Sequence, residues 1–504
     1  MTYSRRLIAS VAALTLSGAV VFAASGRDDL TPKDLARVKA VTAPAETFTA
    51  PEQFEAMPGG AATVRKIINR DIFSHPSANL RFEERETFSV GNGLFRKDWV
   101  TAPSSTQTSD GLGPLFNARS CQGCHLKDGR GHPPATAEDD AVSMLVRLSV
   151  PPATDEERGM LADRHALAIG DAVYGTQLQD FAIPGLPGEG RVKITYEDVP
   201  VALNGGETVA LRKPTLEIVD PGYGPMRPDL MTSARVAQPM IGLGLLEAID
   251  ESDILARADP DDADGDGISG RPNHVRDPET GEIRLGRFGW KAITPSIRVQ
   301  SASAFNGDMG LSSPPVPNPY GDCTAAQADC LSRPTGIQTA FGADEVPEDL
   351  LKLVVFYSQN LAVPERRDMD DAQVLAGKAE FYAAGCPACH TPKFVTRRDA
   401  EGQAQRFQLI WPYTDMLLHD MGEGLADDRP EGDADGREWR TQPLWGIGLA
   451  KTVSEEATFL HDGRARTILE AVLWHGGEAQ ASRDRVVGMT PEERANLIRF
   501  LESL

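Results

Sequence analysis

The sequence predicts a mainly α-helical fold in two domains, each built around one C-x-x-C-H motif, with a β-rich insertion in the first domain. Three observations lead to this prediction. The motifs CQGCH and CPACH lie 265 residues apart in a chain of 504 residues. Amphipathic segments with helix start and stop signals flank the second motif. Between the two motifs, runs of alternating apolar and polar residues indicate β-strands.

Length and charge limit the organisation and the partners of the protein. A chain of 504 residues is too long for one ordinary hydrophobic core. Its formal net charge is -22, with 41% apolar residues. Nucleic acids and anionic membrane surfaces attract basic proteins, so we expect neither as a partner. The acidic surface serves either solvation alone or attraction of a basic partner protein.

Residues 1–23 have the pattern of a secretory signal peptide. Arg5 and Arg6 precede an apolar run, and small residues suit cleavage near Ala23. The apolar segments that follow are too short to span a bilayer. We therefore expect an exported protein of a bacterial periplasm. Residues 24–65, rich in proline and alanine, are predicted to form an extended segment.

The β insertion is predicted at residues 140–220, inside a first domain of residues 66–365. Segments 143–150, 191–199 and 208–219 alternate apolar with polar residues and are rich in β-branched side chains. Glycine and proline turns lie between these segments. We expect them to form antiparallel strands.

Helical patterns account for most of the remaining elements. Residues 242–258 and 348–362 predict helices of the first domain. The C-terminal domain, residues 366–504, opens with a helix that Gly385 ends directly before the second motif. A capping box at Thr490 starts its last amphipathic helix. A helix, a C-x-x-C-H motif and a terminal helix form the layout of a small cytochrome c domain.

Both C-x-x-C-H motifs have the spacing that attaches c-type haem. Two thiols one short turn apart reach the vinyl groups of haem, and the following histidine binds the iron. A zinc site would need a second C-x-x-C within about 20 residues, and a thioredoxin-like pair has no need of the histidine. We therefore expect two covalent haems. Their residues are Cys121, Cys124 and His125 in the first motif, and Cys386, Cys389 and His390 in the second.

Another histidine is predicted to lie near the second haem. Thr467 starts a capping box, so a short helix should run from Ile468 and end at Gly476. Ile468, Val472 and His475 have the spacing of one helix face, which places His475 on the apolar side. A buried core histidine and a ligand of the second iron both fit this position.

Other side chains compete for the second iron. His419 and Met421, in LLHDMGEG, are the alternative ligands. His461 lies in a turn before the capping box. It either contacts a haem propionate or braces a surface turn.

Three side chains compete for the sixth position of the first iron. His132 follows His125 closely, and Met309 and Met240 lie in glycine-containing segments. An open, five-coordinate iron is the further alternative. This choice decides whether a small oxidant can reach the first haem, because an iron with six ligands has no vacant position.

Four tracts carry a resemblance to a known family: GLGPLFNARSCQGCHLKDGRG; GLGLLEAI with DPDDADGDGISGRPN and GRFGWKA; TDMLLHDMGEGLAD; and FLHDGRARTILEAVLWHGG. In these tracts the chain resembles the dihaem oxidoreductases often labelled thiol oxidoreductases, which are related to bacterial dihaem cytochrome c peroxidases. The resemblance to the peroxidases is narrower and covers RTQPL, HDG and TILEAV. It implies a peroxidase-like oxidoreductase.

The resemblance also implies roles for particular residues. In the related peroxidases, a methionine fourteen residues after the HDG histidine is the distal ligand of the second haem, and here that position is His475. The implied ligands are His390 and His475, with a lower potential than a His/Met iron. Trp290, in GRFGWKA, is implied as an electron bridge, with core packing as the alternative. Arg287 and Lys291 are candidates for pairing with propionates.

A calcium-type motif, D-x-D-x-D-G-I, opens the loop 262–273. Alternate aspartates direct carboxylates into one cavity, and glycine permits the sharp turn. The expected ligands are Asp262, Asp264, Asp266 and the carbonyl of Ile268. Asn273 replaces the usual glutamate at the twelfth position, and a solvated acidic turn is the alternative. The related peroxidases hold calcium between their haems, which implies a bracing role.

Cys323 and Cys330 remain after the motif cysteines. An exported protein keeps disulfides, so we expect a bridge that closes a small loop and contributes roughly 2–3 kcal/mol. Two free thiols are the alternative.

These patterns lead to two hypotheses about function. In the favoured one, the haem of His390 and His475 takes electrons from a small redox protein or a quinol-linked donor, and the other haem reacts with a small oxidant or substrate. In the alternative, both irons are six-coordinate and the protein only carries electrons. The sequence leaves the substrate and the oligomeric state unspecified, and it contains no independent sign of a thiol substrate.

Overall fold

The computed structural model describes residues 26–504 except 107, 137–138, 140–142, 339 and 341. The expected signal peptide lies outside the described residues. Of those described, 29% are helical and 17% lie in strands or bridges, so the predicted mainly α-helical class is wrong. The chain contains 47 glycines and 36 prolines, which interrupt helices and favour turns and irregular segments. Within the described part, none of the helices has both the length and the hydropathy of a membrane span.

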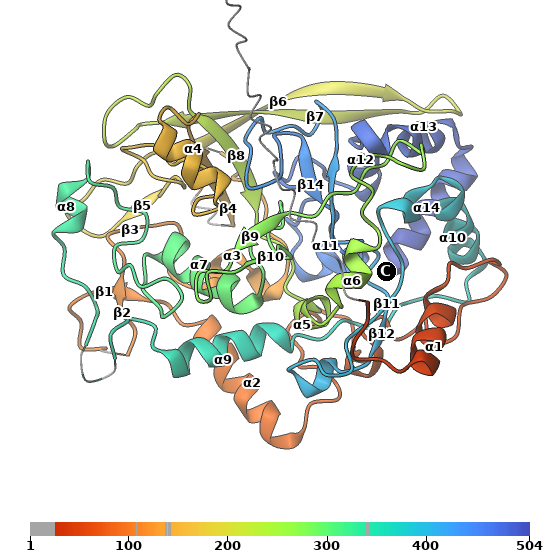
Figure 1. Cartoon of the computed structure of the whole chain (residues 1–504). Coiled ribbons are helices and arrows are strands. Elements are labelled where there is room, and N and C mark those ends of the chain that lie inside the picture. Colours follow the sequence, from red (N-terminus) through yellow and green to blue (C-terminus); the bar gives the residue numbers. More distant parts are fainter. Residues whose placement is uncertain (1–25, 107, 137–138, 140–142, 339, 341) are drawn as a thin grey trace, which may run out of the picture.

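The helices are short and distributed over the whole chain (Figure 1). The α-helices are α1 (Pro32–Thr42), α2 (Phe82–Phe95), α3 (Cys121–Cys124), α4 (Asp155–Ala162), α5 (Leu243–Glu247), α6 (Glu251–Leu255), α7 (Ile297–Met309), α8 (Ala328–Leu331), α9 (Glu348–Gln359), α10 (Ala372–Ala383), α11 (Ala450–Val453), α12 (Ile468–Leu473), α13 (Gln480–Gly488) and α14 (Pro491–Ser503). The 3-10 helices are η1 (Gly60–Ala62), η2 (Leu126–Asp128), η3 (Cys386–Ala388), η4 (Gln403–Gln405), η5 (Ile447–Leu449) and η6 (Gly477–Ala479).

The strands join in two-stranded sheets, antiparallel except for the first pair. The pairs are β1 (Val100–Thr101) with β2 (Asp110–Leu112), β3 (Leu115–Phe116) with β5 (Phe181–Ala182), β4 (Met144–Ser149) with β8 (Met231–Val236), β6 (Arg191–Ala202) with β7 (Thr208–Val219), β9 (His274–Arg276) with β10 (Ile283–Leu285), β11 (Phe394–Val395) with β12 (Leu409–Ile410), and β13 (Leu418–Asp420) with β14 (Glu438–Arg440).

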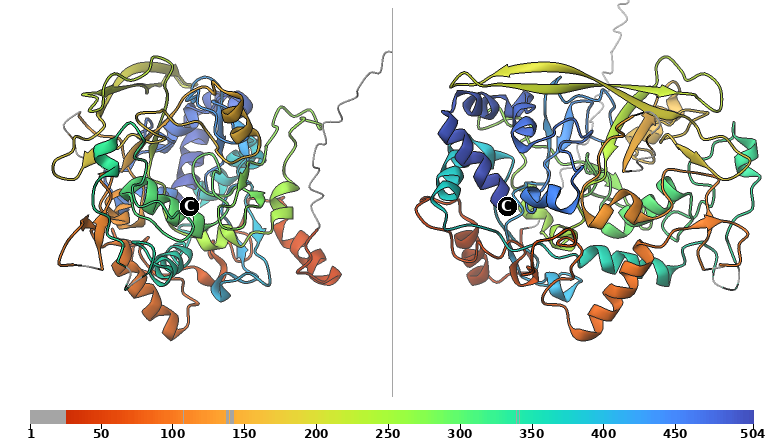
Figure 2. Two further views of the ribbon diagram at one scale, coloured as in Figure 1. Left: turned by 60° about the vertical axis from the view of Figure 1, so that its left-hand side comes forward. Right: turned by 180° about the vertical axis from the view of Figure 1, so that it is seen from behind.

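The predicted β insertion forms two separate strand pairs. β6 and β7 make a long hairpin in which Arg191 faces Val219, while β4 pairs with the later strand β8. Figures 1 and 2 show the hairpin spanning one side of the molecule as far as α12 and α13. Leu203 and Leu211 of the hairpin pack against Leu473 of α12. The insertion therefore connects the two halves of the chain.

Two helix pairs, α2 with α9 and α10 with α14, have the same architecture. A glycine lies at each crossing. A Cβ on Gly91 would be 2.3 Å from the Leu353 carbonyl oxygen, and one on Gly377 would be 1.9 Å from that of Asn496. Only glycine permits this close approach of two backbones. Four residues after each glycine, an aromatic ring of the first helix contacts one of the second, at 5.1 and 5.2 Å between centroids.

The N-terminal segment, expected to be extended, contains helix α1 and packs on the C-terminal half. Glu52 and Glu55 form ion pairs of 2.8 and 2.9 Å with the buried Lys378 of α10. Glu55 also contacts Arg366. Because buried charges need partners, these pairs fix the segment against the second helix pair.

Candidate haem sites

Each helix pair holds one C-x-x-C-H motif at the same place. The first motif forms α3 and the second begins in η3. The ring of His125 lies 6.3 Å from that of Phe95 on α2, between centroids. The ring of His390 lies 6.4 Å from that of Phe381 on α10. Both histidines are therefore oriented by the same contact with the first helix of their pair.

The hydrogen bonds of three histidines prepare them to bind a metal. Each Nδ1 lies against a backbone carbonyl oxygen: His125 against Gln238 (2.7 Å), His390 against Tyr413 (3.0 Å) and His475 against Ala471 (2.8 Å). A carbonyl only accepts hydrogen bonds, so each Nδ1 carries the proton. The lone pair is then on Nε2, which is the nitrogen a haem iron would bind.

Burial keeps these three imidazoles neutral. It lowers the pKa of His125 and of His475, and it lowers the pKa of His390 to about 4. Only a neutral imidazole binds a metal. The three residues therefore have the protonation state of ligands at neutral pH.

His390 and His475 have the separation expected of two ligands of one iron. Their ring centroids are 6.5 Å apart, and both rings line a cavity together with Cys386 and Cys389. Metal–nitrogen bonds of about 2 Å place the centroids of two imidazoles on one ion roughly 6 Å apart. The second C-x-x-C-H site therefore fits a haem held by both histidines.

His419, one alternative ligand of the second iron, has other partners in the structure. His419 is buried between Asp415, 2.7 Å from its Nε2, and Glu478, 2.6 Å from its Nδ1. Burial alone would lower its pKa, but Asp415 and its neighbours raise the pKa well above the usual value. Both nitrogens of His419 therefore have carboxylate partners, and neither is left for an iron. Met421 lines the cavity beside it.

His461 lies in the interior, so the alternative of a surface turn is wrong. Its ring stacks on Trp439 with 3.8 Å between centroids, and Nδ1 lies 3.1 Å from the carbonyl oxygen of Ala234. Among the described residues its buried Nε2 has no hydrogen-bond partner. This nitrogen lies in the wall of the second cavity.

The first cavity surrounds the first C-x-x-C-H motif, and the cavity described above, around the second motif, is the second cavity. Met240 and Met309 line it together with His125, and Met309 is also part of the buried core. The Nε2 of His132 lies 3.0 Å from a carboxylate oxygen of Glu456 instead. The two methionines therefore remain close to the first haem site, and His132 has another partner.

Trp290 lines both cavities. Its indole Nε1 donates to the carbonyl oxygen of Val236 at 2.9 Å. Arg287 and Lys291, which we expected to pair with propionates, have protein partners instead. Arg287 donates to backbone carbonyls of α5 and its C-terminal turn, and Lys291 forms a buried ion pair of 2.8 Å with Asp427.

The structure reveals an internal repeat that the sequence analysis missed. Residues 236–246, VAQPMIGLGLL, match residues 440–450, RTQPLWGIGLA. Residues 288–297, FGWKAITPSI, match residues 459–468, FLHDGRARTI. Each copy of the latter pair forms the same turn, bridged in one copy from Phe288 to Thr294 and in the other from Phe459 to Ala465. A comparison of the sequence with itself could have found the first match, in which five of eleven residues are identical, whereas the second shares only its first Phe and last Ile and rests on the common turn.

The two copies contact each other reciprocally. The Val236 amide donates to the His461 carbonyl at 2.7 Å, and the Arg440 amide donates to the Trp290 carbonyl at 2.9 Å. Val236 and Arg440 are equivalent in the repeat, as are His461 and Trp290. Exchange of equivalent contacts is the property of a two-fold axis. The two copies of the repeat are therefore related by an approximate two-fold axis.

The repeat makes helix α7, which faces the first cavity, equivalent to helix α12, which faces the second. Helix α12 lines the second cavity with Ile468, Val472 and the following His475. Helix α7 lines the first cavity with residues at the equivalent positions, and the residue equivalent to His475 is Ala304. The side chain of Ala304 has no atom that binds iron.

The calcium-type loop gathers three carboxylates, one of which the motif did not include. Oxygens of Asp259, Asp262 and Asp264 lie within 4.8 Å of one another. Asp266 instead accepts a hydrogen bond of 2.8 Å from the amide of Ile268. Asp259 precedes the motif by three residues, and a local turn joins its carbonyl oxygen to the amide of Asp262 at 2.9 Å.

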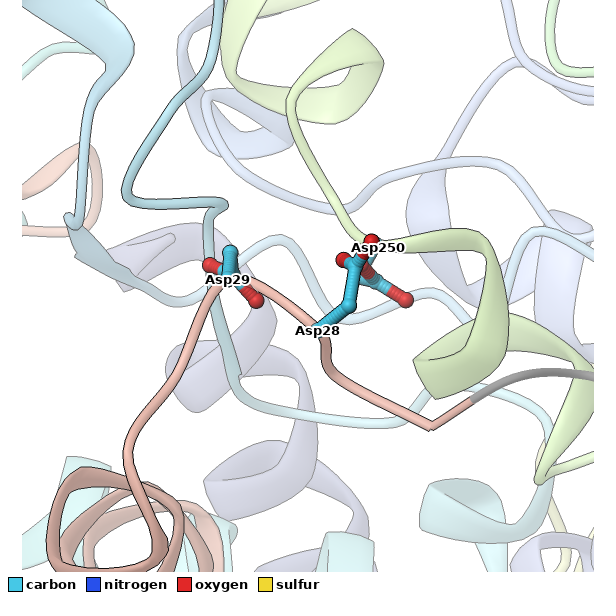
Figure 3. Close-up of side chains that lie close together, drawn as sticks. All are labelled: Asp28, Asp29 and Asp250. Atoms are coloured by element: carbon cyan, nitrogen blue, oxygen red, sulfur yellow. The ribbon is translucent and has the colours of Figure 1, made fainter.

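Another group of aspartates lies where the N-terminal segment meets α6. Asp28, Asp29 and Asp250 lie close together in Figure 3. Arg27 pairs with Asp29 at 2.8 Å, and Arg397 pairs with Asp28 and contacts Asp250. These carboxylates are therefore held by arginines.

The two cysteines outside the C-x-x-C-H motifs form the predicted disulfide. Cys330 lies in α8, and its Cα atom is 6.2 Å from that of Cys323.

Comparisons with known proteins point to one family. A family model described as "Di-haem oxidoreductase, putative peroxidase" matches residues 54–504. No curated protein sequence matches the chain. Among solved structures, a chain of Kuenenia stuttgartiensis hydrazine synthase pressurised with xenon is 17% identical, with a TM-score of 0.22. That alignment covers 31% of this chain and 55%, about half, of the other.

Proposed function

This chain belongs to the di-haem oxidoreductase family, and from that premise we propose that it is an exported, peroxidase-like enzyme with two covalent c-type haems. Each haem would be attached through the two cysteines of one C-x-x-C-H motif. When bound, the haem irons supply one-electron chemistry that amino-acid side chains lack. The residues around them determine which site stores electrons and which site reacts.

His390 and His475 would hold the second haem from both faces. The support for this proposal is their centroid separation of 6.5 Å together with the Nδ1 hydrogen bonds that direct both Nε2 lone pairs toward the cavity. Two neutral imidazoles leave no vacant position on the iron. This site would therefore store and transfer electrons, and a small redox protein or a quinol-linked donor would supply them.

His125 would hold the first haem from one face only. The observation that carries this proposal is Ala304, which occupies the position of His475 in the internal repeat and offers no ligand. A small oxidant would then bind in the first cavity. Hydrogen peroxide fits this role, since one molecule takes up two electrons and two protons and yields two water molecules. An electron carrier with two six-coordinate irons is the hypothesis that Ala304 disfavours.

Trp290 would connect the two sites. It lines both cavities, and its carbonyl oxygen accepts the Arg440 amide of the other copy of the repeat. An indole between two redox centres shortens the path that electrons cross between them.

The calcium-type loop would hold Ca²⁺ through Asp259, Asp262 and Asp264 as a structural brace. Calcium should then raise the melting temperature of the wild type and have less effect on Asp262→Asn.

Low-temperature EPR of the partly reduced protein tests the functional proposal. We expect a high-spin signal from the first haem beside a low-spin signal from the second. His475→Ala should convert the low-spin signal to high-spin, whereas His461→Ala should leave it low-spin. Low-spin signals alone in every redox state would support the electron carrier and contradict the enzyme.

A further inference from the structure

Two buried arginines in the wall of the second cavity have no carboxylate partner in the part of the chain that the structure describes. Arg130 and Arg440 are 7% and 4% exposed, and both line the cavity that contains His390 and His475. Among the described residues, neither forms an ion pair. A guanidinium keeps its charge in proteins, so burial without an anion is costly.

Their hydrogen bonds hold the arginines in place without neutralising them. Arg130 donates to the carbonyl oxygens of Thr458 at 2.9 Å and Leu460 at 3.4 Å. Arg440 donates to the carbonyl oxygen of Gly289 at 3.0 Å and to the side chain of Gln442 at 2.9 Å. All these acceptors are neutral. The two positive charges therefore remain uncompensated inside the protein.

The pKa values of both groups reflect this missing charge. Burial lowers the pKa of Arg130 to about 10. Burial also lowers the pKa of Arg440 to about 10, and the more distant Asp415 opposes the shift. A nearby anion would favour the charged form and reverse the shift.

The first cavity provides a contrast within the same molecule. Arg235 and Arg429 are also buried in its wall, but Glu431 pairs with both, at 2.6 and 3.0 Å. Within the described part of the chain, Glu431 thus pairs with the two buried arginines of the first cavity, and no carboxylate pairs with the two of the second. An anion from outside the polypeptide would complete the second cavity.

We propose that Arg130 and Arg440 bind the two propionates of the second haem. This inference rests on the proposed function, in which a haem is held by His390 and His475. Haem carries two carboxylates on the side of the ring away from its vinyl groups, and the vinyl groups would bond to Cys386 and Cys389. Two guanidiniums match two propionates in charge and in hydrogen-bonding geometry.

The position of the arginines sets the orientation of the haem. The guanidinium of Arg130 lies over the ring of Trp290, 5.7 Å from its centroid, and the Arg440 amide binds the Trp290 carbonyl. The propionate edge of the second haem therefore faces Trp290 and the first site. Arg440 also donates to the side chain of Gln238 at 3.4 Å, and the Gln238 carbonyl holds His125. One residue thus links the propionate of one haem to the ligand of the other.

Redox titration of the second haem tests the proposal in the full holoprotein. Arg130→Gln and Arg440→Gln should each lower its midpoint potential, because an uncompensated propionate stabilises the oxidised iron. Arg130→Lys and Arg440→Lys keep the charge and should lie closer to the wild type. A role limited to bracing backbone carbonyls would not depend on charge. Arg483→Gln is the matched control, since Arg483 lines the same cavity but is partly exposed, with Asp484 beside it.

The proposal is overturned if the second haem of both glutamine variants keeps the wild-type midpoint potential. This outcome counts only when the variants hold two haems per chain and their second haem is low-spin. Absence of that low-spin haem in the wild type would instead contradict the proposed function. If the glutamine variants do not fold, redox infrared difference spectra of wild-type protein with ¹³C-labelled propionates decide. Ionised propionates in both redox states support the pairing, and a protonated propionate of the second haem overturns it.

Discussion

Trp290 and His461 occupy equivalent positions in the internal repeat, and their rings meet edge to face with centroids 6.4 Å apart. Trp290 lines both cavities, and His461 lines the second. Each residue accepts a backbone hydrogen bond from the opposite copy, through Val236 or Arg440. The closest approach of the two sites is therefore built from the same turn used twice, with an indole in one copy and an imidazole in the other.

Replacement of the indole should slow electron transfer between the haems. Trp290→Phe keeps an aromatic ring but loses the Nε1 hydrogen bond to Val236, at a cost of about 1 kcal/mol in the free energy of unfolding. Trp439→Phe is the control, because it loses a similar bond to Leu425 and lines only the second cavity. Stopped-flow reduction of the first haem measures the rate. Equal rates in the two variants would contradict a bridging role for Trp290.

A histidine at position 304 should close the first haem site. Ala304→His places on α7 a histidine equivalent to His475 of the other copy of the repeat. This side chain should bind the first iron, so the iron should change from high-spin to low-spin and peroxide turnover should fall. Ala304→Leu adds bulk without a nitrogen ligand and should remain high-spin. EPR distinguishes the two variants. A low-spin first haem already present in the wild type would point to Met309 or Met240 as its ligand.

The helix crossing at Gly377 should not tolerate a side chain. Gly377→Ala places a Cβ 1.9 Å from the Asn496 carbonyl oxygen, so α10 and α14 must separate. We expect the free energy of unfolding to fall by about 2 kcal/mol or more. Gly93→Ala is the control on an exposed turn of α2, where an added Cβ would meet no atom beyond its own helix within 4 Å. This change should raise the free energy of unfolding by up to about 1 kcal/mol. Thermal unfolding of the holoprotein compares the two variants.

The buried cluster around Glu431 should make stability depend on pH. Burial alone would raise the pKa of Glu431, but Arg235 and Arg429 hold it far below its usual 4.5. A depressed pKa contributes stability above pH 4.5, and that contribution is lost as pH falls through the lower folded-state value. Glu431→Gln should therefore cost about 3 kcal/mol at neutral pH. The difference from the wild type should shrink below pH 4.5, and a difference independent of pH would contradict this ion-pair role.

Local patterns in the sequence were sufficient for many elements. Helices α9, α10 and α14 begin close to their predicted starts, and the three predicted strands are present. Capping residues, glycine stops and alternating polarity act over a few residues, so they can be recognised without the fold. The fold class was wrong because such patterns identify single elements, and they leave out the long irregular segments that connect them.

The sequence by itself determined the two C-x-x-C-H motifs and the position of His475 on an apolar helix face. Only the tertiary structure decided that Glu478 joins Asp415 in contact with His419, and that Arg130 and Arg440 line one cavity. Spacing along the chain fixes which residues share one turn or one helix face. Burial, charge pairing and contacts across the approximate two-fold axis join residues from separate parts of the chain, such as Arg130 and Arg440, and these contacts exist only once the chain has folded.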